Sequence, residues 1–141
     1  FMALNHVSLD VPAGQRVAII GKSGSGKSTL LNLLTGIDQA TAGTVLISGQ
    51  SLGQSSENEL ARWRGKNVGI VFQFFQLMPT LTVLENIVFA MDLVGIVPTG
   101  QRESKARNLL DQVGLADQAD KLPQTLSSGQ QQRVAIARAL A

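Results

Sequence analysis

Cysteine is absent from this sequence of 141 residues, and histidine occurs only once, as His6. Without cysteine the chain forms no disulfide and offers no thiolate to a metal, and nothing in it argues against a reducing cytosol. His6 lies outside any motif, so we expect it to be an exposed strand residue rather than a catalytic one. We therefore do not expect the function to depend on cysteine or histidine side chains.

A strong charge of one sign is also missing, because 12 Lys and Arg residues face 10 Asp and Glu residues without a basic block. This pattern gives no reason to expect nucleic-acid binding. The longest apolar stretch, residues 87–97, is interrupted by Asp92 and Gly95 and is too short to cross a bilayer. We expect no direct insertion into a membrane, so any connection with one would go through a partner.

What the sequence does contain is a glycine-rich segment, GKSGSGKSTLL, at residues 21–31. It fits the phosphate-loop pattern of Gly, four residues and Gly-Lys-Ser. The apolar run at residues 16–20 before it predicts a buried strand, and residues 30–34 after it predict a helix that Gly36 ends. A flexible Ser/Gly turn is the simpler alternative, but it does not explain the Lys-Ser pair between these two elements.

The chemistry of the segment indicates a nucleoside-triphosphate site. The glycines allow positive φ and a close approach to an anion, and successive N–H groups at a helix N-terminus attract phosphate. Lys27 would reach the β- and γ-phosphates, and the Ser28 hydroxyl would be a ligand of Mg²⁺. The predicted nucleotide-binding residues are Gly21, Lys22, Ser23, Gly24, Ser25, Gly26, Lys27, Ser28 and Thr29.

The rest of the chain mixes short strand-like runs with amphipathic helices, which favours an α/β fold. We expect strands at residues 6–11, 44–47 and 68–72, and helices at about 56–63, 82–91, 101–113 and 130–141. Ser56–Glu59 and Thr82–Glu85 have the pattern of capping boxes, while Gly65 and Gly114 are placed to end helices. Gln73 would then lie at the carboxyl end of a buried parallel strand, where open α/β sheets bind ligands.

Three marks now follow in order: the phosphate loop, Gln73, and LSSGQQQRVAIARAL at residues 126–140. Together they resemble the ATP-binding cassette (ABC) ATPases, in which the last stretch looks like the signature motif and Gln73 the Q-loop glutamine. The resemblance covers the whole chain. It implies a P-loop NTPase fold of the ABC ATPase type, with a helical subdomain inserted after the Q-loop. The implied division is an ATP-binding core (1–73), a helical subdomain (74–126) and the signature motif and helix (127–141).

The resemblance also implies roles. Lys27 and Gln73 would be the catalytic residues, ATP and Mg²⁺ the cofactors, and Ser28 and Gln73 the contacts of the metal. Two subunits would face head to tail, so that the signature motif caps the γ-phosphate of ATP held by the opposite subunit. The signature residues are Ser127, Ser128, Gly129 and Gln130.

The sequence departs from the family in places. Ser128 stands where the signature motif has its first glycine, and at positive φ its Cβ would cost on the order of 1 kcal/mol. No adenine-stacking aromatic is visible. The chain ends before the position of the family's Walker B strand, so the resemblance implies a truncated domain. We expect such a chain to expose apolar sheet surface, to associate, and to bind nucleotide with little hydrolysis.

The amino-acid sequence at residues 66–73 and 77–86 resembles that of the lipoprotein-release and macrolide-export type of ABC ATPase. The apolar loop of Phe74, Phe75, Leu77, Met78 and Pro79 would either contact a transmembrane subunit or pack between subdomains. The expected function is that of an ATP-hydrolysing transporter subunit driving export or extraction, cytoplasmic and peripheral on the inner face of the cell membrane. The alternatives are a regulatory module that binds nucleotide without hydrolysis, and a soluble ABC ATPase without a transport role.

Overall fold

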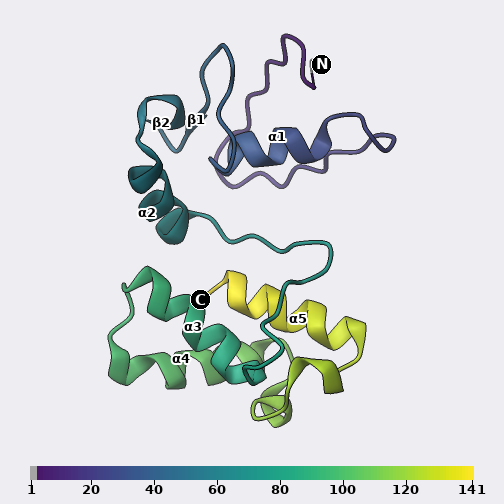
Figure 1. Ribbon diagram of the computed structural model, residues 1–141, viewed down its shortest axis with the longest axis vertical. Coiled ribbons are helices and arrows are strands. Elements are labelled where there is room, and N and C mark those ends of the chain that lie inside the picture. Colours follow the sequence, from purple (N-terminus) through teal and green to yellow (C-terminus); the bar gives the residue numbers. More distant parts are fainter. Residues whose placement is uncertain (1–2) are drawn as a thin grey trace. The chain divides into compact units, whose positions relative to one another are not determined.

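The computed structural model describes residues 3–141, which form two compact units, one ending at Leu60 and the other running from Ala61 to Ala141. Figure 1 shows mostly helices, joined by long connections. The helices are α1 (Lys27–Leu34), α2 (Glu57–Asn67), α3 (Val83–Val94), α4 (Thr99–Gln112) and α5 (Ser128–Ala139), with 3₁₀ turns at Leu52–Gln54, Ala116–Gln118 and Pro123–Thr125. None of the helices in residues 3–141 has the length and apolar character needed to span a membrane. The division expected from the resemblance, with boundaries at residues 73 and 126, stays a prediction.

Within the described residues 3–141, the paired β-strands form one short antiparallel hairpin. Strand β1 (Leu46–Ile47) pairs with β2 (Gln50–Ser51), with Leu46 opposite Ser51 and Ile47 opposite Gln50. The two turn residues, Ser48 and Gly49, have φ of 49° and 80°. Positive φ at both positions suits the right-handed twist of a two-residue hairpin. The predicted strand at residues 44–47 is therefore confirmed in its second half.

The three predicted strands at residues 6–11, 16–20 and 68–72 are wrong. None of them hydrogen-bonds to a neighbouring strand within residues 3–141, and several of their apolar side chains face solvent. Ile20 is 90% exposed and Val17 53% exposed. A buried parallel strand needs partners on both edges and helices on both faces, and sequence periodicity cannot supply them. The sequence shows that these segments are apolar, but whether a segment pairs as a strand depends on other segments far away in the sequence.

Helix α2 begins as expected and ends later than expected. Ser56 and Glu59 form the predicted capping contacts, with the Ser56 N–H donating to Glu59 Oε2 over 2.8 Å. The helix then continues through Gly65 to Asn67, whose side chain donates to the Trp63 carbonyl over 2.9 Å. A Cβ at Gly65 would lie 3.3 Å from Val94 Cγ2. Gly65 therefore allows α2 to approach α3 closely rather than ending the helix.

Helices α3, α4 and α5 enclose the main hydrophobic core, which lies in the second unit. Val83, Ile87, Leu110 and Val134 are fully buried there, along with Met91, Ala106, Leu115 and Ala137. Backbone N–H groups of Val83 and Leu84 donate to the carbonyls of Lys121 and Ala119, so the α4–α5 connection is pinned against the start of α3. The predicted amphipathic face of residues 101–113 is confirmed, and Gly114, at φ 67°, ends α4.

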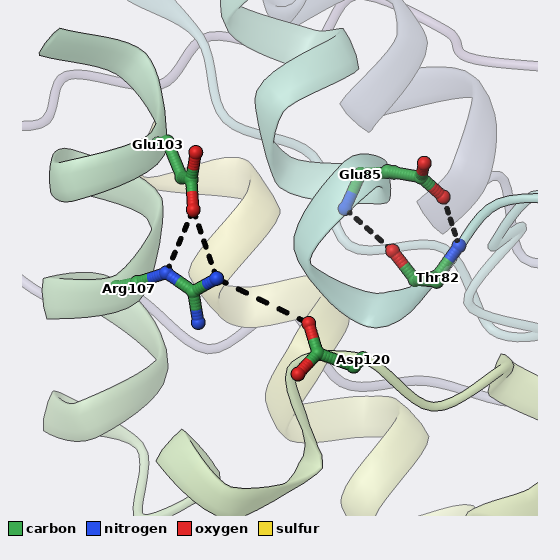
Figure 2. Close-up of polar contacts among 5 residues, drawn as sticks. All are labelled: Thr82, Glu85, Glu103, Arg107 and Asp120. Carbon is green, nitrogen blue, oxygen red and sulfur yellow. Dashed lines mark hydrogen bonds and ion pairs between the residues drawn. The ribbon is translucent and has the colours of Figure 1, made fainter.

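Polar contacts fix the ends and surface of this bundle (Figure 2). The Thr82–Glu85 capping box is confirmed, because the Thr82 N–H donates to Glu85 Oε2 over 2.7 Å and the Glu85 N–H donates to Thr82 Oγ1 over 3.2 Å. Arg107 of α4 binds Glu103 one turn earlier and lies 4.0 Å from Asp120. These last side chains are largely exposed, so their pairing contributes little to stability, whereas the cap satisfies donors that the helix itself leaves open.

We expect the 141-residue chain to self-associate, because unpaired extended segments with exposed apolar side chains favour strand addition from a second molecule. Sedimentation velocity measures this directly. Ile20→Lys should weaken association, since it places a charge on the 90% exposed position of an extended segment. Leu93→Lys, at a 72% exposed position on helix α3, is the matched control and should change little. A monomeric wild-type chain that melts cooperatively would contradict the prediction.

We expect Thr82→Ala to fray the first turn of α3 and raise amide exchange there on the order of five-fold, the usual effect of losing an N-cap. The hydrogen bonds from the Thr82 backbone and side chain lower the pKa of Glu85 below 4.5. A lowered carboxylate pKa stabilises the fold above pH 4.5, and this contribution is lost as the pH falls through the folded-state pKa. Hydrogen exchange by mass spectrometry should therefore show that Glu85→Gln costs more at neutral pH than at a pH acid enough to protonate Glu85 in the folded protein. An equal cost at both would refute this.

Candidate nucleotide-binding site

The loop before α1 turns into the helix through a left-handed glycine. Gly26 is the residue preceding α1 and has φ of 87°. A Cβ at Gly26 would lie 2.8 Å from the Ala3 carbonyl oxygen and 2.9 Å from Leu4 Cδ2. Gly24 also has positive φ, 79°, but the space around it is open. Gly26 is thus required both by its backbone conformation and by the neighbouring chain.

The expectation of positive φ at Gly21 is wrong, although a glycine is needed there for another reason. Gly21 is not among the glycines with positive φ. A Cβ at this position would lie 2.7 Å from Ser25 Oγ. The loop folds back on itself at this point, with the Ser25 N–H donating to the Lys22 carbonyl over 3.3 Å. The glycine therefore makes room for the loop's own side chain.

The N-terminus of α1 is open. No side chain hydrogen-bonds to its first turn among the described residues, and Gly26 contributes only its carbonyl, to the Leu30 N–H at 2.9 Å. The N–H groups of Lys27, Ser28 and Thr29 stand at the positive end of the helix dipole. An uncapped helix start behind a glycine-rich loop can bind a phosphate through these donors.

Lys27 reaches back over the loop. Its Nζ donates to the Gly21 carbonyl over 2.8 Å and to the Lys22 carbonyl over 2.7 Å, and lies 3.5 Å from Ser25 Oγ. Oxygen atoms of the loop itself therefore hold the ammonium in place. An ammonium offers three donors, so phosphate oxygens can replace these partners without leaving the charge unsatisfied.

The donors near Lys27 suit Mg²⁺ as a partner of phosphate rather than as a resident metal. Ser28 lies in the first turn of α1 and is exposed, and its hydroxyl is a hard oxygen ligand. Across residues 3–141 there is no group of three His, Asp or Glu side chains able to hold a metal. Mg²⁺ typically uses one or two protein oxygens together with substrate phosphates and water, and Ser28 fits that chemistry.

Gln73 is exposed and lies in a turn rather than at a strand end. The Phe75 N–H donates to the Phe72 carbonyl over 3.0 Å, which closes a four-residue turn with Gln73 at its second position. The expected placement at the carboxyl end of a strand is therefore wrong, because residues 68–72 are unpaired. Gln73 belongs to the second unit and the phosphate loop to the first.

The predicted signature motif forms the start of α5. Ser127 is the N-cap, accepting from the Gln130 N–H at 3.3 Å, while Gln130 Oε1 accepts from the Ser127 N–H at 2.9 Å. Ser128 is the first residue of the helix and does not have positive φ. The strain that a positive φ would have caused at Ser128 is therefore absent. Ser127, Ser128 and Gly129 are all exposed, and nothing lies within 4 Å of where a Cβ on Gly129 would stand.

Sequence reasoning missed two side chains that hold the loop after Gln73. Asn86, 2% exposed, accepts from the Met78 N–H at 2.7 Å and donates to the carbonyls of Met78, Leu81 and Thr82 at 2.9–3.1 Å. Arg138 of α5 donates to the carbonyls of Phe75 and Gln76. A polar residue on the apolar face of α3, as Asn86 is, was a usable signal. For Arg138 no local signal exists, because its partners are more than sixty residues away.

Comparison with known proteins agrees with this geometry. The family model described as ABC transporter matches residues 4–141. An uncharacterised ABC transporter ATP-binding protein of Mycobacterium tuberculosis is 51% identical over 140 residues, covering 98% of this chain and 55% of that protein. The lipoprotein-releasing system ATP-binding protein LolD of Chromohalobacter salexigens is 47% identical, covering 97% of this chain and 57% of that protein. The methionine import ATP-binding protein MetN 1 of Salmonella paratyphi A is 46% identical, covering 99% of this chain and 40% of that protein.

Solved structures give the same result. The dimeric post-hydrolysis structure of the ATP-binding cassette MJ0796, bound to ADP and Pi, has a TM-score of 0.89 and 42% sequence identity. The match covers 99% of this chain and 61% of that chain. The chain thus spans a little over half the length of the first of these relatives, so the activity and partners of a whole protein are matters for proposal.

We expect Gly26→Ala to weaken Mg²⁺·ATP binding by more than about ten-fold, because the added Cβ meets both a forbidden φ and the Ala3 carbonyl. Gly24→Ala is the matched control, since it shares the positive φ but has open space around it. Isothermal titration calorimetry on both variants measures the difference. Equal losses would show that the close contact at Gly26 has no part in the site.

Proposed function

The chain belongs to the ABC transporter family, and from this premise we propose that it is the ATP-binding part of a transporter subunit. The fold is that of the P-loop ABC ATPases. In the proposal, the chain binds ATP with Mg²⁺ at residues 21–29, and the intact protein hydrolyses ATP to drive transport by a membrane partner. The observation that carries the proposal is the open N-terminus of α1, with the Lys27 ammonium held against the loop by the carbonyls of Gly21 and Lys22.

The roles follow from the chemistry of the loop. Backbone N–H groups at the start of α1 bind the phosphates, and Lys27 exchanges the carbonyls of Gly21 and Lys22 for phosphate oxygens. Mg²⁺, when bound, neutralises charge on the phosphates, and Ser28 supplies a protein oxygen to it. Gln73, exposed in its turn, is proposed to contact the metal or the attacking water. Glu and Asp are absent from residues 21–29, so the loop itself contains no general base.

The start of α5 is proposed to complete the site of a second subunit. Ser127, Ser128 and Gly129 are exposed at a helix N-terminus, and the open space at Gly129 leaves room for a partner's phosphate. A two-fold head-to-tail dimer would then hold two ATP molecules between its subunits. The solved structure of MJ0796 is a dimer bound to ADP and Pi, which supports the proposal of a dimer. Because Ser128 adopts a helical conformation, it no longer argues for a regulatory module that has lost hydrolysis.

The apolar loop after Gln73 is proposed to contact the transmembrane subunit. Phe74 is 83% exposed and Met78 is also exposed, whereas Phe75 and Leu77 are half-buried, with Leu77 packed against the helical core. The exposed residues of the loop are therefore the ones proposed to make this contact, while Leu77 packs within the second unit. An aromatic side chain held on the surface is the usual anchor of a protein interface. The subunit would be cytoplasmic and attached to the membrane through this contact.

The names of the relatives support transport but not one direction. Lipoprotein release and methionine import both occur among proteins of nearly equal identity to this chain. We keep export or extraction as the proposal, on the resemblance of residues 66–73 and 77–86 to the lipoprotein-release type. A soluble ABC ATPase acting on nucleic acid has no support in a net charge of +2.

We expect Lys27→Ala to abolish measurable ATP binding, because it removes the charge that contacts the phosphates. Lys22→Ala, in the same loop, is the matched control, since Lys22 contributes a carbonyl rather than its side chain to the contact with Lys27. Calorimetry measures binding, and phosphate release measures turnover. We expect the 141-residue chain to bind ATP with turnover far below that of the intact protein. Equal binding by Lys27→Ala would overturn the proposed site, and turnover at the intact rate would show that these residues supply the base.

A further inference from the structure

The segment after Gln73 contains a strained turn. Phe75 and Gln76 have φ of 58° and 47°, a conformation that bulky side chains rarely adopt. The Gln76 N–H donates to the Phe74 carbonyl over 2.6 Å, which closes a three-residue turn centred on Phe75. With positive φ at its central residue, this is the less stable form of such a turn. A backbone of this kind persists only where other contacts hold it.

Those contacts come from Arg138, near the end of α5. Its Nη1 donates to the Gln76 carbonyl over 2.6 Å and its Nη2 donates to the Phe75 carbonyl over 2.7 Å. One planar guanidinium therefore binds the carbonyls of both residues with positive φ, and its fixed geometry sets their spacing. Figure 1 shows the connection from α2 to α3 passing beside α5.

Arg138 binds these carbonyls in a partly desolvated place. It is half-buried, and burial lowers the pKa of its guanidinium from the usual value. A buried cation needs hydrogen-bond partners, and here its partners are backbone oxygens rather than a carboxylate. These hydrogen bonds therefore fix the backbone conformation of the turn at Phe75 and Gln76.

A second arginine on the same helix shows what is particular to Arg138. Arg133 donates through Nη1 to the carbonyl of Val113, at the end of α4, over 2.9 Å. Like Arg138, Arg133 binds a backbone carbonyl, but it uses one nitrogen and does not contact the turn at Phe75 and Gln76. Arg133 thus tethers α5 to α4, while Arg138 tethers α5 to the segment that carries Gln73 and Phe74.

We propose that Arg138 is a positioning residue that holds the turn at Phe75 and Gln76, so that Gln73 and Phe74 move together with α5. This inference rests on the proposed function, in which the start of α5 meets the partner subunit's ATP, Gln73 serves the chain's own ATP and Phe74 contacts the membrane subunit. Phe74 is the first residue of this turn, and Gln73 directly precedes it. Arg138 is then the direct link between α5 and the two contacts.

The first test measures the turn without using ATP. A nitroxide label at position 74, introduced through Phe74→Cys, reports local motion, and the chain has no other cysteine. We use the full-length protein, with any cysteine outside these residues replaced. Arg138→Gln should increase the mobility of the label in the spin-resonance spectrum, because the shorter, uncharged glutamine side chain lacks the planar fork whose two nitrogens bind the two carbonyls. Arg133→Gln should leave the spectrum as in the wild type.

Arg138→Lys keeps the charge but loses the planar fork, so it should give a mobility between those of the wild type and Arg138→Gln. If Arg138→Gln does not fold by circular dichroism, the Lys variant decides alone. Increased mobility supports the proposal. A wild-type spectrum from the folded Arg138 variants overturns it.

The second test separates positioning from general stability. Arg138→Gln should leave the ATP dissociation constant within about two-fold while lowering kcat by about ten-fold, the loss expected for one charged hydrogen bond. Arg138→Lys should recover part of the rate, and Arg133→Gln should keep it. Unchanged kcat in Arg138→Gln overturns the proposal. If the wild-type protein binds no ATP, the proposed function fails, and the mobility of the label still decides whether Arg138 holds the turn.

Discussion

The left-handed turn at Gly26 is the constraint on which the candidate site depends. It changes the direction of the chain in one residue, so that α1 starts directly behind the loop and has no side-chain cap. At a capped helix start a Ser, Thr or Asp side chain accepts from one of the first N–H groups, whereas at α1 no side chain of residues 3–141 competes with a ligand for these donors. Because Gly26 lacks a side chain, these donors stay open, and the Lys27 side chain reaches back to the Gly21 carbonyl. The neighbouring Ala3 carbonyl then excludes any larger residue.

In the second unit, the helices hold the irregular loop after Gln73 in one conformation. Its helical core buries apolar side chains from α3, α4 and α5, and two polar side chains project from these helices onto the loop. Asn86 satisfies backbone groups of Met78, Leu81 and Thr82, and Arg138 satisfies those of Phe75 and Gln76. Buried or half-buried backbone groups outside regular structure need such partners. The helices therefore provide stability, and the loop can carry exposed residues such as Phe74.

Sequence reasoning succeeded where the signals are local. Capping at Ser56 and Thr82 and the helix stop at Gly114 depend on residues within a few positions of each other. It failed for the strands at residues 16–20 and 68–72, because pairing depends on segments that periodicity does not identify. Gly65 was misread for a related reason, since its role is contact with Val94 across the bundle. The φ of Ser128 could not be known before the helix start was seen, and the link from Arg138 joins residues far apart in sequence.

The two units also differ in how much they bury, and this bears on how ATP acts. The second unit has a core of buried aliphatic side chains, whereas in the described part of the first unit the buried apolar side chains are Leu52 and Leu60. A unit with so little core gains much of its order from whatever binds it. A ligand present at 100 times its dissociation constant adds about 2.7 kcal/mol to the stability of the state that binds it. If ATP occupies the loop before α1, that contribution goes to the less stable unit, and nucleotide binding and folding of the first unit become one coupled equilibrium.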